Sequence, residues 1–328
     1  GITISSSGNV DSIGIITATT FKGTFDGSLS SSADATVNGV TVGKGANSVA
    51  TNTVLGVNAL DAAVTGANNT ALGNGALGSN TSGPENTSVG SETLEANTTG
   101  QRNTAVGYRA LEDNVTGDYN TAVGAYALPE NTTGDHNVAI GRNALRYATT
   151  ADQNTAVGGL ALDGTTTGDN NVAVGYYALK ANTTGTQNVS VGSLALDAQT
   201  TQSNSTAIGY AALGANTISG NTAVGHRSLA NNTTGAGNLA IGKDSLYTNS
   251  TGNYNIAVGY DALQQNNANN NTAIGHDALK LNTTGTNNTA VGMNALDACT
   301  TGAMCVAVGS GALGAVTTGE KNIGIGYL

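Results

Sequence analysis

The feature that most constrains this chain is a short repeat that runs through most of its length. A glycine that follows Val, Ile or Leu first occurs at Gly56 and recurs at near-constant spacing up to Gly326. Of the 16 intervals between these glycines, 14 are 17 residues long and two are 16. The unit is N-T-A-V-G-x-x-A-L-x-x-N-T-T-G-x-x, and its positions are numbered below from the glycine, position 0. Such regularity indicates stacked rungs, because a closed globule does not give every copy the same environment.

The length of the unit decides between the repeat architectures. A helix pair needs about 33 residues or more, so 17 residues are too few. Position +4 is Leu in all 16 complete copies, and position −1 is Val, Ile or Leu in all 17. Gly, Thr and Asn, which are abundant here, are poor helix formers. We therefore predict an all-β chain, a parallel β-solenoid or β-roll of about 17-residue coils over 52–328, with two short strands and two turns in each coil.

Substitutions between copies indicate which way the strand T-A-V faces. Position −3 is Val, Leu or Ile in seven copies, so we expect −3 and −1 to face inward and −2 to face outward. Position −2 is Ala, Ser or Gly in 16 of 17 copies, which predicts a second copy of the chain packed closely against it in an intertwined or tightly packed homotrimer. The alternative is that both faces lie inside one wide coil. The trimer-interface candidates are Ala105, Ala122, Ala139, Ala156, Ala173, Ala207, Ala223, Ala240, Ala257, Ala273 and Ala290.

Asparagine recurs at −4 and, less strictly, at +7. Stacked Asn amides can form hydrogen bonds from rung to rung, and the glycine between them permits a tight turn. One loop replaces both asparagines by Cys299 and Cys305, so we predict a disulfide there, with two separately buried thiols as the alternative. A turn ladder also explains the N-glycosylation sequons better than a glycosylated surface does. These sequons are at Asn97, Asn114, Asn131, Asn182 and Asn282.

Composition and charge exclude several classes of function. The net charge of −10 argues against a nucleic-acid partner, and no apolar run is long enough for a membrane-spanning helix. His136, His226 and His276 lie at the variable positions −5 and +1 without a recurring catalytic partner. We therefore expect no enzymatic activity, no cofactor and no metal. A column of acidic residues at +11 fits a solvated edge, with a Ca²⁺ site as the alternative: Asp118, Asp135, Asp152 and Asp169.

Variable residues gather at +1 and +2, directly after the glycine. Their variability predicts exposure, and Tyr beside Arg or His can stack on a sugar and donate hydrogen bonds to it. The alternative is a solvated corner where Tyr only covers the turn. The candidates for glycan contact are Tyr108, Arg109, Tyr126, Tyr176, Tyr177, Tyr210, His226, Arg227, Tyr260 and His276.

Residues 1–51 do not follow the repeat. They alternate apolar and β-favouring residues with Gly, as in GIITATTFKGTFDG, which predicts a β-rich entry or adaptor segment. Because the regular part carries no evident caps, we expect the chain to be a piece of a longer polypeptide.

The repeat NTAVGYRALEDNVTGDYNTAVG resembles the repeats of phage tail-fibre proteins, and the leader resembles cyanophage fibres in particular. More distantly, positions −4 to 0 are similar to the repeats in the heads of YadA-type trimeric autotransporter adhesins. That resemblance implies a left-handed parallel β-roll in a packed homotrimer. The 17-residue period is longer than the usual unit of that family.

Three functions follow as hypotheses. The first is a shaft segment of a virion tail fibre or extracellular appendage, with other fibre or baseplate proteins as partners, which presents a host-attachment tip. The second is an adhesin that binds host surface glycans along the Tyr-rich edge. The third is an ice-binding solenoid, prompted by the Thr columns, although an inward −3 Thr would argue against it.

Overall fold

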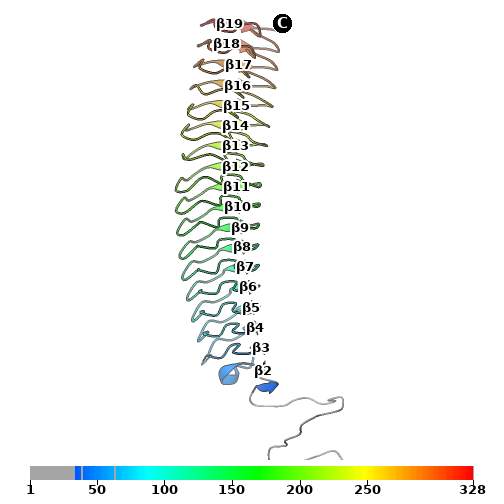
Figure 1. The fold of residues 1–328 in the computed structure, drawn as a ribbon, viewed down its shortest axis with the longest axis vertical. Helices are drawn as coiled ribbons and strands as arrows, with labels where there is room; N and C mark the ends of the chain where they lie inside the picture. The colour runs from blue at the N-terminus through cyan, green and yellow to red at the C-terminus, as the bar shows by residue number, and fades with distance from the viewer. Residues whose placement is uncertain (1–33, 38–39, 63, 328) are drawn as a thin grey trace, which may run out of the picture. The chain divides into compact units, whose positions relative to one another are not determined.

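The computed structural model describes residues 34–37, 40–62 and 64–327, and these form a β-solenoid (Figure 1). Each coil contributes one three- or four-residue strand to a single continuous sheet. From β3 onward every strand pairs in parallel with the next, and equivalent residues of the repeat face each other. The strands are β1 Ala35–Val37, β2 Val40–Gly43, β3 Thr53–Gly56, β4 Thr70–Leu72, β5 Thr87–Val89, β6 Thr104–Val106, β7 Thr121–Val123, β8 Val138–Ile140, β9 Thr155–Val157, β10 Val172–Val174, β11 Val189–Val191, β12 Thr206–Ile208, β13 Thr222–Val224, β14 Leu239–Ile241, β15 Ile256–Val258, β16 Thr272–Ile274, β17 Thr289–Val291, β18 Val306–Val308 and β19 Ile323–Ile325.

The predicted parallel β-solenoid of about 17-residue coils is confirmed, but the second strand of each coil is not present in the described coils. After the glycine the backbone turns through left-handed residues at +2 and +4, such as Arg109 (φ 55°) and Leu111 (φ 52°). An extended strand cannot contain such residues. Main-chain hydrogen bonds between rungs nevertheless continue on this side, for example from Leu111 N to Ala127 O at 3.1 Å.

The predicted facing of the strand is wrong. Position −2 points into the coil, whereas −3 and −1 point outward. Ser88 at −2 contacts Thr93 at +3 of the same coil through their hydroxyls, 2.5 Å apart, so the two positions meet across the interior. The interior is narrow, and this internal contact limits −2 to small residues. The eleven alanines predicted at a trimer interface are therefore fully buried in their own chain and offer no surface to a second one: Ala105, Ala122, Ala139, Ala156, Ala173, Ala207, Ala223, Ala240, Ala257, Ala273 and Ala290.

The +4 leucines form the second column of the core. From Leu60 to Leu296 each is fully buried. Their left-handed backbone, with φ between 47° and 55°, costs about 1–2 kcal/mol per residue. Full burial of a Leu side chain contributes about 1.5–3 kcal/mol, which offsets that cost. An aliphatic residue of this size is therefore needed at +4 in every rung.

The predicted asparagine ladders are confirmed. At −4 the main-chain N–H donates to the side-chain oxygen of the Asn one rung before wherever that residue is Asn, as from Asn120 to Asn103 at 2.8 Å; Ser205 interrupts the column. At +7 the side chains bond directly, as from Asn114 Nδ2 to Asn97 Oδ1 at 2.8 Å. Both columns are buried. Buried amides that satisfy one another fix the register of the coils.

The described part of 1–51 covers one end of the solenoid, and residues 1–33 lie outside the described residues. Strand β2 pairs antiparallel with both β1 and β3. The short 3-10 helix η1, Ala46–Ser48, follows, and Ala46 N donates to Leu60 O at 3.0 Å. Asp34 accepts hydrogen bonds from the main-chain N–H groups of Lys44 and Gly45, both at 2.6 Å. This segment therefore pairs the strand edge of the first coil and packs on its leucine.

Candidate functional site: the outer face and the variable edge

The outer face of the sheet is formed by the −3 and −1 side chains of β3 to β19. Position −1 carries an aliphatic residue in every rung, yet these side chains remain substantially exposed, as Ile140 (40%) and Ile274 (41%) show. Position −3 carries Thr in ten rungs and Val, Leu or Ile in seven. No charged residue occupies either column in these strands. The result is a continuous, uncharged and largely apolar strip along the solenoid.

A strip of this kind is uncommon on a monomeric protein. Contiguous exposed apolar patches larger than a few hundred Å² usually mark an interaction site. The sheet has seventeen strands from β3 to β19 with two outward residues each, or 34 residues on one face. A standard protein interface uses about 20–30 residues a side. The outer face is thus large enough for a stable contact.

The variable edge consists of the side chains at +1, +2 and +5. Here the structure brings together the predicted glycan-contact residues as columns that run from rung to rung. Their exposure differs between the two columns. Tyr108, Tyr176, Tyr210, His226, Tyr260 and His276 at +1 are exposed, whereas Arg109, Tyr126, Tyr177 and Arg227 at +2 are half-buried.

Aromatic side chains of the edge stack on one another. Tyr210 and His226 lie 5.3 Å apart between ring centroids, at an interplanar angle of 19°. Tyr260 and His276 lie 5.1 Å apart at 9°. Each of these histidines therefore covers one face of a tyrosine in the preceding rung, and less of that ring is free for a sugar than the sequence suggested.

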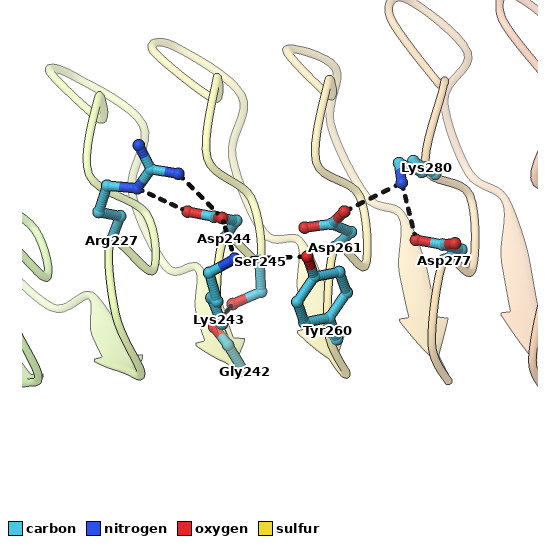
Figure 2. Close-up of polar contacts among 9 residues, drawn as sticks. All are labelled: Arg227, Gly242, Lys243, Asp244, Ser245, Tyr260, Asp261, Asp277 and Lys280. Atoms are coloured by element: carbon cyan, nitrogen blue, oxygen red, sulfur yellow. Dashed lines mark hydrogen bonds and ion pairs between the residues drawn. The ribbon is translucent and has the colours of Figure 1, made fainter.

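Charged side chains of the edge pair between neighbouring rungs (Figure 2). Arg227 donates to both carboxylate oxygens of Asp244, at 2.8 and 3.0 Å. Lys243 approaches Asp244 at 3.3 Å and donates to the Tyr260 hydroxyl at 3.3 Å. Burial alone would raise the pKa of Asp244, but the hydrogen bonds from Arg227 and Lys243 hold that pKa below its usual value. Asp244 is therefore an anion fixed between two cations.

The same pairing continues in the next rungs. Lys280 lies 2.9 Å from Asp261 and 3.0 Å from Asp277 (Figure 2). Both contacts raise the pKa of Lys280. This stretch of the edge, from β13 to the coil after β16, is a neutralised network that ties four coils together.

Three glutamates gather at the other end of the edge. Carboxylate oxygens of Glu92, Glu95 and Glu112 lie within 4.8 Å of one another. The Arg109 guanidinium lies among them, 2.5 Å from Glu92 and 3.4 Å from Glu112. A side-chain cation therefore already compensates much of this negative charge.

The aspartate column at +11 has a role that the sequence interpretation missed. Each carboxylate accepts the main-chain N–H of the +11 residue one rung before, as Asp135 does from Asp118 at 2.7 Å and Asp152 from Asp135 at 2.7 Å. Ser203 and Asn253 do the same in later rungs. The column thus accepts hydrogen bonds from main-chain N–H groups of the turns. The recurrence of short polar side chains at +11 was the sequence signal for this role.

The two cysteines are buried and free in the structure. Cys299 Sγ lies 3.7 Å from Gly302 O, and Cys305 Sγ lies 3.2 Å from Gly319 O. The thiols thus approach carbonyls of two different turns, as the asparagines they replace do, and the predicted disulfide is not formed here. Burial raises the pKa of the Cys299 thiol.

The asparagines of the sequons belong to the buried +7 ladder. Asn97, Asn114, Asn131, Asn182 and Asn282 have no exposed surface, and each side-chain amide donates to a main-chain carbonyl of its own turn. A glycan cannot be attached to them in the folded chain.

Comparison with known proteins gives no relative: no protein family, no curated protein and no solved structure matches this chain. Within the described residues, no helix is long and apolar enough to cross a membrane.

Proposed function

We propose that this chain is part of the shaft of a virion tail fibre or extracellular appendage, and that copies of it assemble through the outer face. The observation that supports this is the aliphatic column at −1, which is half-exposed in an isolated chain. At about 4.8 Å per rung, the 17 rungs span about 80 Å, which suits a rigid spacer between a particle and an attachment tip.

The preferred partner is a second copy of the same chain. A partner that covers the whole outer face must repeat at the same spacing as the rungs. A copy in parallel register meets that condition along the entire solenoid, and the absence of charge on the face removes like-charge repulsion between copies. Three copies around a common axis would bury all three faces, in a homotrimer whose contact residues are those at −1 and −3 rather than the alanines.

Thiol labelling tests this contact. Ile140→Cys places a thiol on the outer face, and Thr150→Cys places one on an exposed turn away from it. In the assembled protein we expect Cys at 140 to react slowly with maleimide and Cys at 150 to react fast. Equal reactivity of the two thiols would contradict the proposal. The native cysteines are buried and give little background.

Ice binding is a second candidate, because the structure removes the argument against it. The −3 threonines face outward beside the −1 aliphatic column, on a regular parallel sheet. This candidate requires a face open to water, so it applies to a single-chain solenoid. Thermal hysteresis of the unassembled chain, lost when Thr104 and Thr121 are both changed to Lys, would favour it, and no hysteresis would exclude it.

A further inference from the structure

Two hollows interrupt the variable edge, and a pair of glycines lies beneath each. The first, of about 380 Å³, lies over Gly75 and Gly78. The second, of about 460 Å³, lies over Gly311 and Gly314. The next coil bounds the first hollow through Glu92 and Glu95, whereas the second lies over the last coil that is complete in the sequence. In each case glycines occupy both +2 and +5 of one coil, where other coils carry side chains such as Arg109 and Glu112. We call them the first and the second notch.

The coil before each notch carries the same polar pair. Asn58 at +2 and Asp61 at +5 line the first notch, and Asn294 and Asp297 line the second. Three coils of the chain carry Gly at +5, and in each case the preceding coil carries Asp at +5. Only the two notch coils also carry Gly at +2. This pattern of Asn, Asp and two glycines therefore occurs twice, about 236 residues apart, although the other lining residues differ.

These polar side chains are free, as are Asp163 and Asp197 at +5 elsewhere on the edge; what distinguishes the notches is the pair of glycines in the next coil. Neither the Asn58 amide nor the Asp61 carboxylate forms a hydrogen bond to any described residue, and the same holds for Asn294 and Asp297. In the coils of Figure 2 the equivalent positions are occupied by ion pairs, such as that of Arg227 with Asp244. The notches thus offer unused acceptors and donors at the rim of a hollow.

We propose that each notch binds one uncharged saccharide unit. Asp and Asn side by side can accept from and donate to neighbouring hydroxyls of a sugar ring. The volumes fall within the range of small-ligand sites, about 300–1,000 Å³. Met293 and Tyr327 add apolar surface to the second notch, on which a ring face can rest.

The charge of the lining selects against acidic sugars. Asp61, Glu92 and Glu95 line the first notch and Asp297 the second, and neither is lined by Lys or Arg. Arg109 compensates Glu92, but no described cation pairs with Asp61 or Asp297, so a carboxylated or sulfated sugar would meet like charge there. The ligand class is therefore a neutral hexose or an N-acetylated hexosamine within a surface glycan.

A glycan array followed by calorimetry with the best neutral ligand tests the proposal. Gly78→Gln with Gly314→Gln fills both notches. Gln264 occupies +5 on the same backbone turn, so the fold accommodates the change. Ala230→Gln is the matched control, since it adds the same side chain at +5 in a coil without either notch. Asp61→Asn with Asp297→Asn keeps the shape and removes only the charge.

We expect neutral glycans to bind the native protein and the Ala230→Gln control equally. Binding should be lost in the filled variant and weakened about tenfold or more in the Asn variant, as for a hydrogen bond to a charged group. Binding of no glycan, binding that survives in the filled variant, or a preference for acidic glycans would each overturn the proposal. The notches lie off the outer face, so the native mass of every variant should stay unchanged, which separates this test from that of the shaft.

Discussion

At the scale of single residues, the glycine at position 0 is fixed by two independent constraints. Its φ lies between 128° and 143° in the described copies from Gly73 onward, a region that residues with a side chain avoid. A Cβ on Gly107 would also lie 2.7 Å from the carbonyl atoms of Gly124 in the next rung. The close stacking of backbones therefore allows no side chain at this position.

Gly107→Ala should lower the free energy of unfolding by about 3 kcal/mol or more, because strain and a clash with main-chain atoms add together. Gly159→Ala is the control, since the nearest atom to a Cβ there belongs to the Tyr176 side chain at 3.6 Å, an ordinary van der Waals contact. Urea unfolding followed by circular dichroism compares the two. Similar midpoints would show that position 0 is not constrained as described.

Asp244 makes the stability of the edge depend on pH. Its pKa is lowered in the folded chain, so the stabilisation that its ion pairs contribute is present at neutral pH and is lost as pH falls below the usual carboxyl range and through the lowered value. Asp244→Asn keeps a residue that tolerates the left-handed backbone there (φ 54°). The variant should melt at a lower temperature than the native protein at pH 7, and the difference should shrink on acidification. A difference that is the same at pH 7 and pH 3 would contradict the assignment.

The buried thiols give a further prediction at this scale. Cys299 and Cys305 should not react with a thiol reagent in the native protein, because both are buried and burial raises the pKa of Cys299. In denaturant without reductant, two thiols per chain should react. A count of zero in denaturant would instead establish the disulfide that the sequence suggested.

At the scale of the coil, the +7 Asn and the +10 Gly depend on each other. A Cβ on Gly134 would lie 2.5 Å from the Asn131 side-chain oxygen, so Gly leaves the space that the amide fills. In the coil that carries Ala148 at +7, the +10 residue is Ala151. The ladder stops there, and the Asn131 oxygen has no hydrogen-bond partner.

This coupling predicts the outcome of a double-mutant cycle. Ala148→Asn alone should destabilise the chain, because the new amide meets the Cβ of Ala151. Ala148→Asn with Ala151→Gly should restore the ladder by donating to Asn131. The expected coupling is about 1–3 kcal/mol in favour of the pair, measured by urea unfolding. Additive effects of the two changes would contradict it.

Much of the coil could be predicted from the sequence, but which strand residues face its interior and which face outward could not. The fixed spacing of Gly56 to Gly326 and the constant Leu at +4 predict rungs with a shared core. The strand T-A-V is ambiguous, because aliphatic −1 and small −2 residues fit either facing when one face can be covered by another chain. The width of the coil decides it: Leu at +4 and Ala, Ser or Thr at +3 already fill most of the interior, and only a small side chain fits opposite them.

The edge was predictable in part. Position +1 is on the surface as predicted, whereas +2 is mostly half-buried or, as at Asp244 and Asp261, buried; the residues of both positions form columns. Which side chains pair depends on contacts between coils, such as Lys243 with Tyr260, that no local pattern specifies. The notches could have been found by aligning +2 and +5, since Gly75 and Gly78 stand out there against charged neighbours.

At the scale of the whole molecule, the account depends on what covers the outer face. The solenoid exposes aliphatic side chains along its sheet, and a face of this kind is usually covered. Further copies of the chain, ice or another partner could cover it. The proposed assembly of copies would account for a −1 column that never varies beyond Val, Ile and Leu although it lies outside the core.

Light scattering on a sizing column measures this most directly. The account predicts a native mass near three times the 32.2 kDa of one chain. Ile140→Lys with Ile208→Lys puts charges on the outer face, where both side chains are 40% exposed in the single chain, and should give a folded monomer. A native protein of one chain, or an oligomer that the two lysines leave intact, would contradict assembly through this face.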